Sequence, residues 1–218
     1  MNNRGLLITF EGGEGCGKST QITLLTDALK STGLGVIIVR EPGGTLLGEG
    51  IRTLLLDPDS YGAVDIRAEL LLYEASRAQL VTERIRPALA TGEAVICDRF
   101  TDSTLAYQGF GRGLPLDEIN SLNSMATGGL QPDLTIVLDL PVEVGLARAT
   151  AQGADRLEAE ELAFHERVRG GFLELADAQP DRMVVIDAAG SEREVHQSVM
   201  AAVERIPVLA MLLERSDG

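Results

Sequence analysis

The chain has 218 residues, the length of one ordinary globular domain, and 44% of them are hydrophobic, which is enough to form a core. Its 19 Lys and Arg residues are outnumbered by 33 Asp and Glu residues, and the net charge of −14 argues against a protein that binds nucleic acid or an acidic membrane surface. No signal peptide and no apolar run near the roughly 20 residues of a membrane span is present, and Cys16 and Cys97 are the only cysteines. We therefore expect one reduced, cytoplasmic domain over residues 1–218.

Five short apolar runs alternate with helical patterns along the chain. The expected strands are Leu6–Phe10, Val36–Val39, Ala94–Cys97, Leu134–Leu138 and Met183–Ile186. Their unbroken apolarity is typical of strands buried on both faces. The expected helices are Thr20–Ser31, Ile66–Ala90 with a kink near Pro87, Leu162–Ala178 and a terminal helix over Val208–Leu213. This alternation predicts an α/β fold of three layers, a five-stranded parallel sheet with helices on both faces.

Polar or glycine-rich segments directly follow four of the expected strands. Residues 11–20 follow the first strand, Arg40–Thr45 the second, Asp98–Phe100 the third and Asp139 the fourth. Because the carboxyl ends of parallel strands meet at one edge of the sheet, we expect the ligand site at that edge.

A complete G-x-x-x-x-G-K-[ST] pattern, the P-loop, spans residues 12–19 between an expected strand and an expected helix. Glycines let consecutive backbone N–H groups surround phosphate oxygens, and the helix that follows adds its positive end. We expect Lys18 to reach the β- and γ-phosphates of a nucleoside triphosphate and Ser19 to help hold Mg²⁺. The expected ATP-binding residues are Gly12, Gly13, Glu14, Gly15, Cys16, Gly17, Lys18, Ser19 and Thr20.

Two classes of P-loop protein are excluded by missing motifs. The guanine-reading Asn-Lys-x-Asp motif of GTPases cannot exist here, because the only lysines are Lys18 and Lys30 and neither lies in such a motif. The Leu-Ser-Gly-Gly-Gln signature of ABC-type ATPases is also missing. A small phosphotransferase with a second substrate close to the P-loop remains.

Four further segments, in order along the chain, resemble conserved segments of the bacterial thymidylate kinases. Residues Ile96–Gln108 resemble the family's signature stretch, Arg40–Thr45 its second conserved loop, Leu72–Arg77 its thymine-binding helix, and Arg156–Glu158 its lid. The resemblance extends from Leu6 to about Leu175. It implies in-line phosphoryl transfer from Mg·ATP to dTMP, which supplies dTDP for dTTP and DNA synthesis, and it implies a homodimer.

The residue types in these segments suit a nucleotide acceptor. Tyr73 and Arg77 project from one helix face, a ring for stacking beside a forked donor, although a core tyrosine with an outward arginine is an alternative. The Arg99 fork suits the acceptor 5′-phosphate, and Asp98 could organise Mg²⁺ through water, unless the two form only a local ion pair. Arg40 is expected near the monophosphate or exposed to solvent.

The resemblance assigns further roles within the acceptor site. It implies that Tyr73 stacks on thymine, that Arg77 donates to a pyrimidine oxygen, and that Glu14 accepts from the 3′-hydroxyl rather than pointing outward. Tyr107 would exclude ribonucleotides, and Gln108 lies near the base or merely packs in its loop. The expected dTMP-binding residues are Glu14, Arg40, Glu41, Pro42, Tyr73, Arg77, Arg99, Ser103, Tyr107 and Gln108.

The P-loop contains no arginine, so the cation that stabilises the transferring phosphoryl group is expected from the lid, about residues 145–160. The candidates are Arg148 and Arg156, and we favour Arg156 because it lies in the matching Arg-Leu-Glu. A surface ion pair of Arg156 with residues 158–161 is the alternative. Together with Lys18 and Arg99, these arginines form the expected catalytic set.

Two other functions remain open at this point. One is a kinase for another deoxynucleoside monophosphate, which Tyr73, Arg77, Tyr107 and Gln108 would decide. The other is a regulatory module that binds nucleotide without transferring phosphate. No structural metal is expected, because the two histidines have no Cys/His spacing around them.

Overall fold

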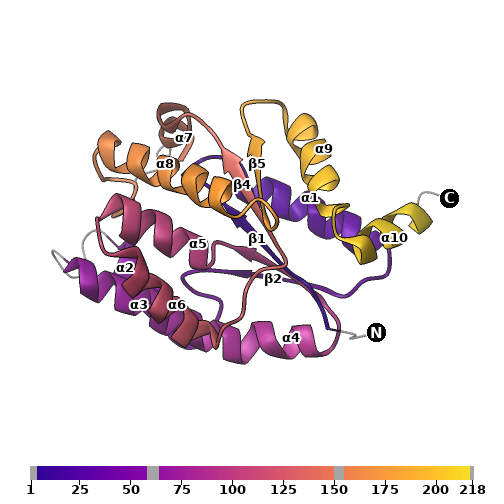
Figure 1. Cartoon of the computed structure of the whole chain (residues 1–218), viewed down its shortest axis with the longest axis horizontal. Coiled ribbons are helices and arrows are strands. Elements are labelled where there is room, and N and C mark those ends of the chain that lie inside the picture. Colours follow the sequence, from indigo (N-terminus) through magenta and orange to yellow (C-terminus); the bar gives the residue numbers. More distant parts are fainter. Residues whose placement is uncertain (1–3, 58–63, 150–154, 217–218) are drawn as a thin grey trace.

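The computed structural model describes residues 4–57, 64–149 and 155–216. Five parallel strands form one sheet in the order β2-β3-β1-β4-β5, as predicted for a three-layer α/β fold (Figure 1). The strands are β1 Leu7–Glu11, β2 Val36–Arg40, β3 Ala94–Asp98, β4 Leu134–Asp139 and β5 Met183–Asp187. Each strand ends one residue later than predicted, on a charged residue, so the polar edge begins inside the sheet. The outer strands β2 and β5 are only partly buried, unlike the predicted double burial.

Helices cover both faces of the sheet (Figure 1). One face packs on α1, α9 and α10, and the other on the α3–α4 segment, the α5–η2 segment and α8. Helices α2 and α6 lie outside α3, and α7 lies beside α8. The bounds are α1 Lys18–Ser31, α2 Leu46–Leu56, α3 Ile66–Leu80, η1 Val81–Ile85, α4 Arg86–Ala90, α5 Thr101–Thr104, η2 Leu105–Gly111, α6 Leu116–Thr127, α7 Val142–Ala149, α8 Leu162–Ala178, α9 Glu192–Val203 and α10 Pro207–Ser216.

The alternation of strand side chains divides the core in two. Ile8 and Phe10 of β1 point toward α1 and α9, whereas Leu7 of the same strand points toward η1 and α4. Both cysteines are buried in these cores, and neither forms a disulfide.

The long helix predicted over Ile66–Ala90 is divided by the π-helical turn η1, and Pro87 lies in the first turn of α4. The sequence patterns did not predict α2, α6, α7 or α9, nor the α5–η2 segment. The π-helical η2 gives no 3.6-residue period that could have been recognised. No described helix has the length and apolarity to cross a membrane.

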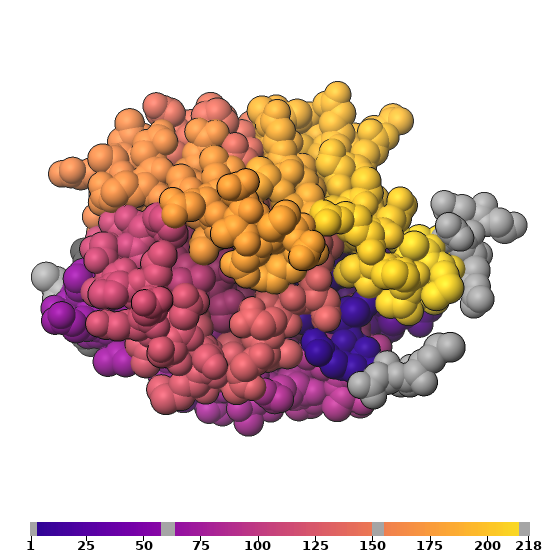
Figure 2. Space-filling model, in the orientation of Figure 1, coloured from indigo at the N-terminus to yellow at the C-terminus, as the bar shows by residue number. Residues whose placement is uncertain are grey.

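The predicted terminal helix over Val208–Leu213 lies within α10. Its Leu209 and Leu213 join the core beside α1. In the space-filling view α10 (yellow) lies next to the first described residues (indigo), so both ends of the described chain are on one side of the molecule (Figure 2).

Candidate functional site

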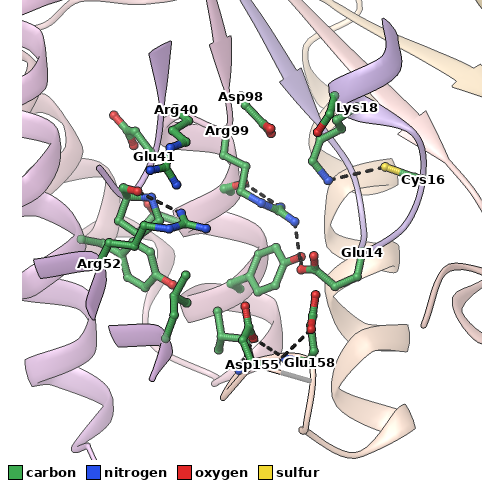
Figure 3. A pocket seen from close by; sticks show the side chains of 18 of the residues that line it. Glu14, Cys16, Lys18, Arg40, Glu41, Arg52, Asp98, Arg99, Asp155 and Glu158 are labelled. Atoms are coloured by element: carbon green, nitrogen blue, oxygen red, sulfur yellow. Dashed lines mark hydrogen bonds and ion pairs between the residues drawn. The ribbon is translucent and has the colours of Figure 1, made fainter. Parts of the chain in front are cut away.

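A cavity of about 400 Å³ opens at the carboxyl edge of the sheet. All ten expected acceptor-binding residues line it, together with Asp98 and residues 14–20 of the P-loop. Gly12 and Gly13 line a smaller neighbouring cavity instead. Six other lining residues were not among the expected site residues, although Thr104, Leu157 and Glu158 belong to segments recognised by resemblance; the other three are Arg52, Leu56 and Asp155. Figure 3 shows Arg99 in the middle of the cavity, with Lys18 and Glu14 on one side and Arg40 and Arg52 on the other.

The P-loop packs closely against the start of α7, and this contact requires glycine. Gly15 has φ +61°, and a Cβ atom there would lie 2.1 Å from the carbonyl oxygen of Gly145. Lys18 is buried beneath the loop, where its Nζ donates to the carbonyl oxygen of Gly13 at 2.9 Å and contacts the Cys16 Sγ at 3.6 Å. The Lys18 ammonium is therefore held by weak neutral acceptors that a phosphate oxygen can replace.

Arg99 connects the P-loop with η2. Its backbone has φ 68°, an uncommon value for a residue other than glycine, and its N–H donates to the Phe10 carbonyl oxygen. The guanidinium donates to the Gly12 carbonyl at 3.0 Å and to Glu14 at 2.9 Å, and it lies over the Tyr107 ring. Arg99 thus points into the cavity and pairs with Glu14, so the alternative of a local pair with its neighbour in sequence is wrong.

Glu14 faces the cavity, which excludes the outward orientation considered from sequence. The Tyr107 hydroxyl donates to its Oε1 at 2.5 Å, alongside Arg99. Burial opposes ionisation of Glu14, but the charges of Arg99 and Lys18 outweigh it and lower the pKa of this carboxyl to about 2. Glu14 is therefore an ionised acceptor at neutral pH.

A second acidic residue, Glu11, accepts hydrogen bonds from two residues of the segment Ile96–Gln108. It ends β1, is fully buried, and accepts from the Phe100 N–H at 2.7 Å and the Ser103 hydroxyl at 2.5 Å. Burial, reinforced by the charge of Asp102, raises the pKa of Glu11 to about 8. This role could not be predicted from the sequence, because Glu11 lies just outside the P-loop pattern and its partners Phe100 and Ser103 are about 90 positions away.

Arg77 is buried, which excludes the outward arginine considered from sequence. Its guanidinium donates hydrogen bonds to Glu41, Glu74, Asn123 and the Phe100 carbonyl, and a second nitrogen of the group lies 2.6 Å from the same Glu41 oxygen. Burial raises the pKa of Glu41 to about 7 even though Arg77 opposes the rise. Arg77 lines the base side of the cavity, where four acceptors already hold its guanidinium in place.

Cations gather where the acceptor phosphate is expected. Arg40 pairs with Glu49 at 2.8 Å and is half exposed, and Arg52 of α2 donates to the Pro42 carbonyl at 3.0 Å. Burial and the charge of Arg40 lower the pKa of Arg52, so these cations repel one another until an anion lies among them. Arg52 carried no sequence motif and was missed for that reason.

The two lid arginines differ in placement. Neither of them lines the cavity. The Arg156 guanidinium donates to Glu69 and to the Leu55 carbonyl, each at 2.6 Å. The alternative pair of Arg156 with residues 158–161 is therefore not formed. Arg148 is exposed at the end of α7, and its Cβ lies 3.1 Å from the position that a Cβ on Gly15 would take. Residues 150–154 of the predicted lid lie outside the described residues.

Ser19 and Asp98 line the same cavity and offer the oxygen ligands that Mg²⁺ prefers. Within the described ranges no group of three or more His, Cys, Asp and Glu side chains could hold a metal ion. This donor set fits an ion that is held mainly by substrate phosphates and water rather than by a dedicated protein cage.

Comparisons with known proteins all point to one family. A family model described as thymidylate kinase matches residues 10–199. The thymidylate kinase of Synechococcus sp. (strain JA-2-3B'a(2-13)) is 56% identical over 204 residues, which cover 93% of this chain and 97% of that protein. The Deinococcus radiodurans enzyme is 52% identical over 204 residues, covering 92% and 97%. The crystal structure of thymidylate kinase from Ehrlichia chaffeensis matches with a TM-score of 0.76 and 34% identity, covering 91% of this chain and 98% of that one.

Proposed function

This chain belongs to the thymidylate kinase family, and we propose that the cavity at the sheet edge performs its reaction with the residue roles given below. The protein is an ATP-dependent kinase that phosphorylates dTMP to dTDP. One observation supports the roles above all: Lys18 of the P-loop, Arg99, and the base-side residues Tyr73 and Gln108 line a single cavity. Donor and acceptor sites therefore adjoin, as direct transfer requires.

On the donor side, the P-loop backbone surrounds the ATP phosphates. Lys18 exchanges the Gly13 carbonyl for the β- and γ-phosphate oxygens, and the N-terminus of α1 adds its dipole. Ser19 and Asp98 would hold Mg²⁺, directly and through water. The metal, when bound, neutralises charge on the ATP phosphates.

On the acceptor side, Arg99, Arg40 and Arg52 hold the 5′-phosphate of dTMP. Glu14, ionised beside Arg99, accepts from the 3′-hydroxyl of the deoxyribose. Tyr107 donates its hydroxyl to Glu14, so its ring is fixed against the sugar and excludes a 2′-hydroxyl sterically.

The base lies between α3 and η2. Tyr73 stacks on the thymine ring, and the Gln108 amide faces its edge. Arg77 is the expected donor to a pyrimidine oxygen, at the expense of one of its present acceptors.

Of the two lid arginines, Arg148 is the better placed to act on the γ-phosphate. It lies next to the P-loop, whereas Arg156 is engaged by Glu69 away from the cavity. The dTMP phosphate, already ionised, attacks the γ-phosphorus in line, so no general base is needed. Lys18, Arg99 and Arg148 then share the task of stabilising the charge on the transferring group.

The test is ADP release from Mg·ATP with dTMP, dUMP, UMP, CMP, AMP and GMP offered separately. We expect strong turnover with dTMP and weaker turnover with dUMP. The Lys18→Ala variant is the control: it should lose turnover while its circular dichroism spectrum stays that of the parent. Turnover at the parent rate in Lys18→Ala would contradict the P-loop assignment, and turnover with another monophosphate alone would contradict the base site.

The same proposal includes a cytoplasmic homodimer whose subunit is one kinase domain. Large apolar side chains are exposed on the outer helices, Leu46 on α2, Leu71 on α3 and Met125 on α6, with exposures of 93%, 55% and 74%. These helices are neighbours outside the sheet (Figure 1). Their apolar side chains support a subunit interface there, and light scattering after size exclusion would test it.

A further inference from the structure

Glu69 of α3 is a fully buried carboxylate that lies outside every motif discussed above. Its Oε1 accepts from the Gln108 Nε2 at 2.9 Å and the Arg112 Nε at 3.3 Å. Its Oε2 accepts from Arg112 at 3.2 Å and from Arg156 at 2.6 Å. One carboxylate therefore joins three segments that are far apart in the sequence, namely α3, the end of η2, and Arg156 in the C-terminal part of the predicted lid.

The surroundings of Glu69 keep it ionised. Burial works against ionisation, but the hydrogen bonds from Gln108 and Arg112 and the adjacent cations lower its pKa. An ionised carboxylate only accepts hydrogen bonds. The amide of Gln108 must consequently turn its NH₂ group toward Glu69.

This orientation decides which atom of Gln108 faces the cavity. Gln108 is buried, lines the cavity, and donates to Glu69. Among the described residues no donor reaches its Oε1 oxygen, which is the amide atom left for a ligand. Thymine and uracil offer an N–H group at ring position 3, whereas cytosine offers only a lone pair there. An amide fixed with its oxygen toward the base thus accepts from the first two and repels the third.

We propose that Glu69 is a positioning residue for acceptor selection, a role that rests on the proposed function. It fixes the Gln108 amide so that pyrimidines with an N–H at position 3 are selected over cytosine. Through the same carboxylate it holds Arg156, so the base reader and the segment Asp155–Leu157, which borders the cavity, share one anchor. Arg112 completes the anchor by pairing with Glu160 at 2.6 Å on its outer side.

The experiment compares kcat/KM for dTMP, dUMP and dCMP in the parent enzyme and in Glu69→Gln. A glutamine at position 69 can donate as well as accept, so the Gln108 amide is no longer held in one orientation. We expect the dTMP-to-dCMP ratio of kcat/KM to fall at least about 10-fold, through a higher KM for dTMP. The dTMP-to-dUMP ratio should not change, because both bases carry the same N–H group. A general structural defect would lower all three activities without changing either ratio.

Two further variants separate the anchor from the base reader. Glu160→Gln removes the outer partner of Arg112 and leaves all the bonds of Glu69, so it should keep the parent ratio. In a Gln108→Ala background, Glu69→Gln should have no further effect on the ratio if Glu69 acts through Gln108. Glu69→Asp, which keeps the buried charge but withdraws it from Gln108, replaces Glu69→Gln if that variant does not fold.

The outcomes are distinguishable. If the parent enzyme does not phosphorylate dTMP, the proposed function fails before any variant is considered. If the parent is active but the dTMP-to-dCMP ratio in Glu69→Gln stays within about twofold of the parent, the positioning role is overturned. Loss of the fold in both Glu69 variants would mark Glu69 as a purely structural anchor and would also overturn it.

Discussion

The cluster formed by Arg77, Glu41 and Glu74 allows a sharp test, because one arginine forms ion pairs with two buried carboxylates. Arg77 is 1% exposed, and Glu41 and Glu74 are 3% and 5% exposed at their side chains. Each carboxylate has one oxygen on Arg77, and its other oxygen has no protein partner. Replacing Arg77 with Met leaves both buried carboxylates without the cation that pairs with them.

Breaking a buried ion pair by removing one partner costs about 3–5 kcal/mol. For a domain of this size that loss corresponds to a fall in Tm of about 6–20 °C. Arg67→Met is the matched control, since Arg67 is exposed on the same helix, and we expect a change within about 0.5 kcal/mol there. The free energy of unfolding of both variants is measured by urea unfolding followed by circular dichroism. The comparison with the parent requires that the m-values are the same.

The pH dependence of the loss provides a second check. Burial raises the pKa of Glu41 to about 7 in the parent, against 4.5 for the ordinary group, so its proton is lost in the folded protein above pH 7. Without Arg77 the folded-state pKa lies higher still, and the folded variant keeps a proton that the unfolded chain has released. The stability of the variant therefore continues to fall above pH 7 while the contribution of Glu41 in the parent has levelled off. The difference between parent and Arg77→Met should grow by up to about 1.4 kcal/mol per pH unit above pH 7. A loss below about 1 kcal/mol, or one equal at pH 6 and pH 8.5, would refute this reasoning.

Three further predictions concern the cavity. Glu14 has a folded-state pKa of about 2 against an ordinary 4.5, so its ionised form stabilises the fold above pH 5, and this contribution of up to about 3 kcal/mol is lost as the pH falls toward 2. The free energy of unfolding in urea should therefore depend less on acid pH in Glu14→Gln than in the parent. An equal dependence in the two proteins would contradict this prediction. Arg148→Gln should lower kcat about 1,000-fold with little change in KM for dTMP, whereas Arg156→Gln should lower kcat far less. Steady-state kinetics measure both variants. If Arg156→Gln lowers kcat more than Arg148→Gln, then Arg156 and not Arg148 is the lid arginine that acts on the transferring phosphoryl group. Chelation of divalent metal should abolish ADP release, and Mg²⁺ should restore it; full activity in excess chelator would argue against Ser19 and Asp98 as part of a metal site.

Local patterns predicted what depends on local physics. The five apolar runs are the five strands, and four of them are followed by the polar segments that meet at the carboxyl edge of a parallel sheet. The P-loop needed only its spacing and its position between strand and helix. Once the segments were recognised by resemblance, the expected acceptor residues came together on one cavity, since their loops leave the same edge.

What sequence could not predict depends on partners distant in the chain. The position of Arg77 on its helix is equally compatible with an arginine that points to solvent. Its burial depends on the hydrogen bond to Glu41, which is 36 positions away in the sequence. From its sequence context alone, Glu69 is indistinguishable from an exposed polar residue of an amphipathic helix. Its burial depends on ion pairs with Arg112 and Arg156, which are distant in the sequence. Arg52 was missed because α2 shows no motif at that position.

An acidic protein can bind anionic substrates here because the cations of the cavity are paired and oriented locally. With a net charge of −14 the whole protein repels phosphates, yet the cavity presents Lys18, Arg40, Arg52 and Arg99 together. Each of these cations is held by an acceptor of the protein itself, a carbonyl oxygen for Lys18 and Arg52 and a carboxylate for Arg40 and Arg99. A phosphate that enters exchanges acceptors rather than recruiting free charges, so the cations are already oriented when the substrate arrives. Preorganisation of this kind favours the transition state, in which negative charge spreads over more oxygens than in either substrate alone.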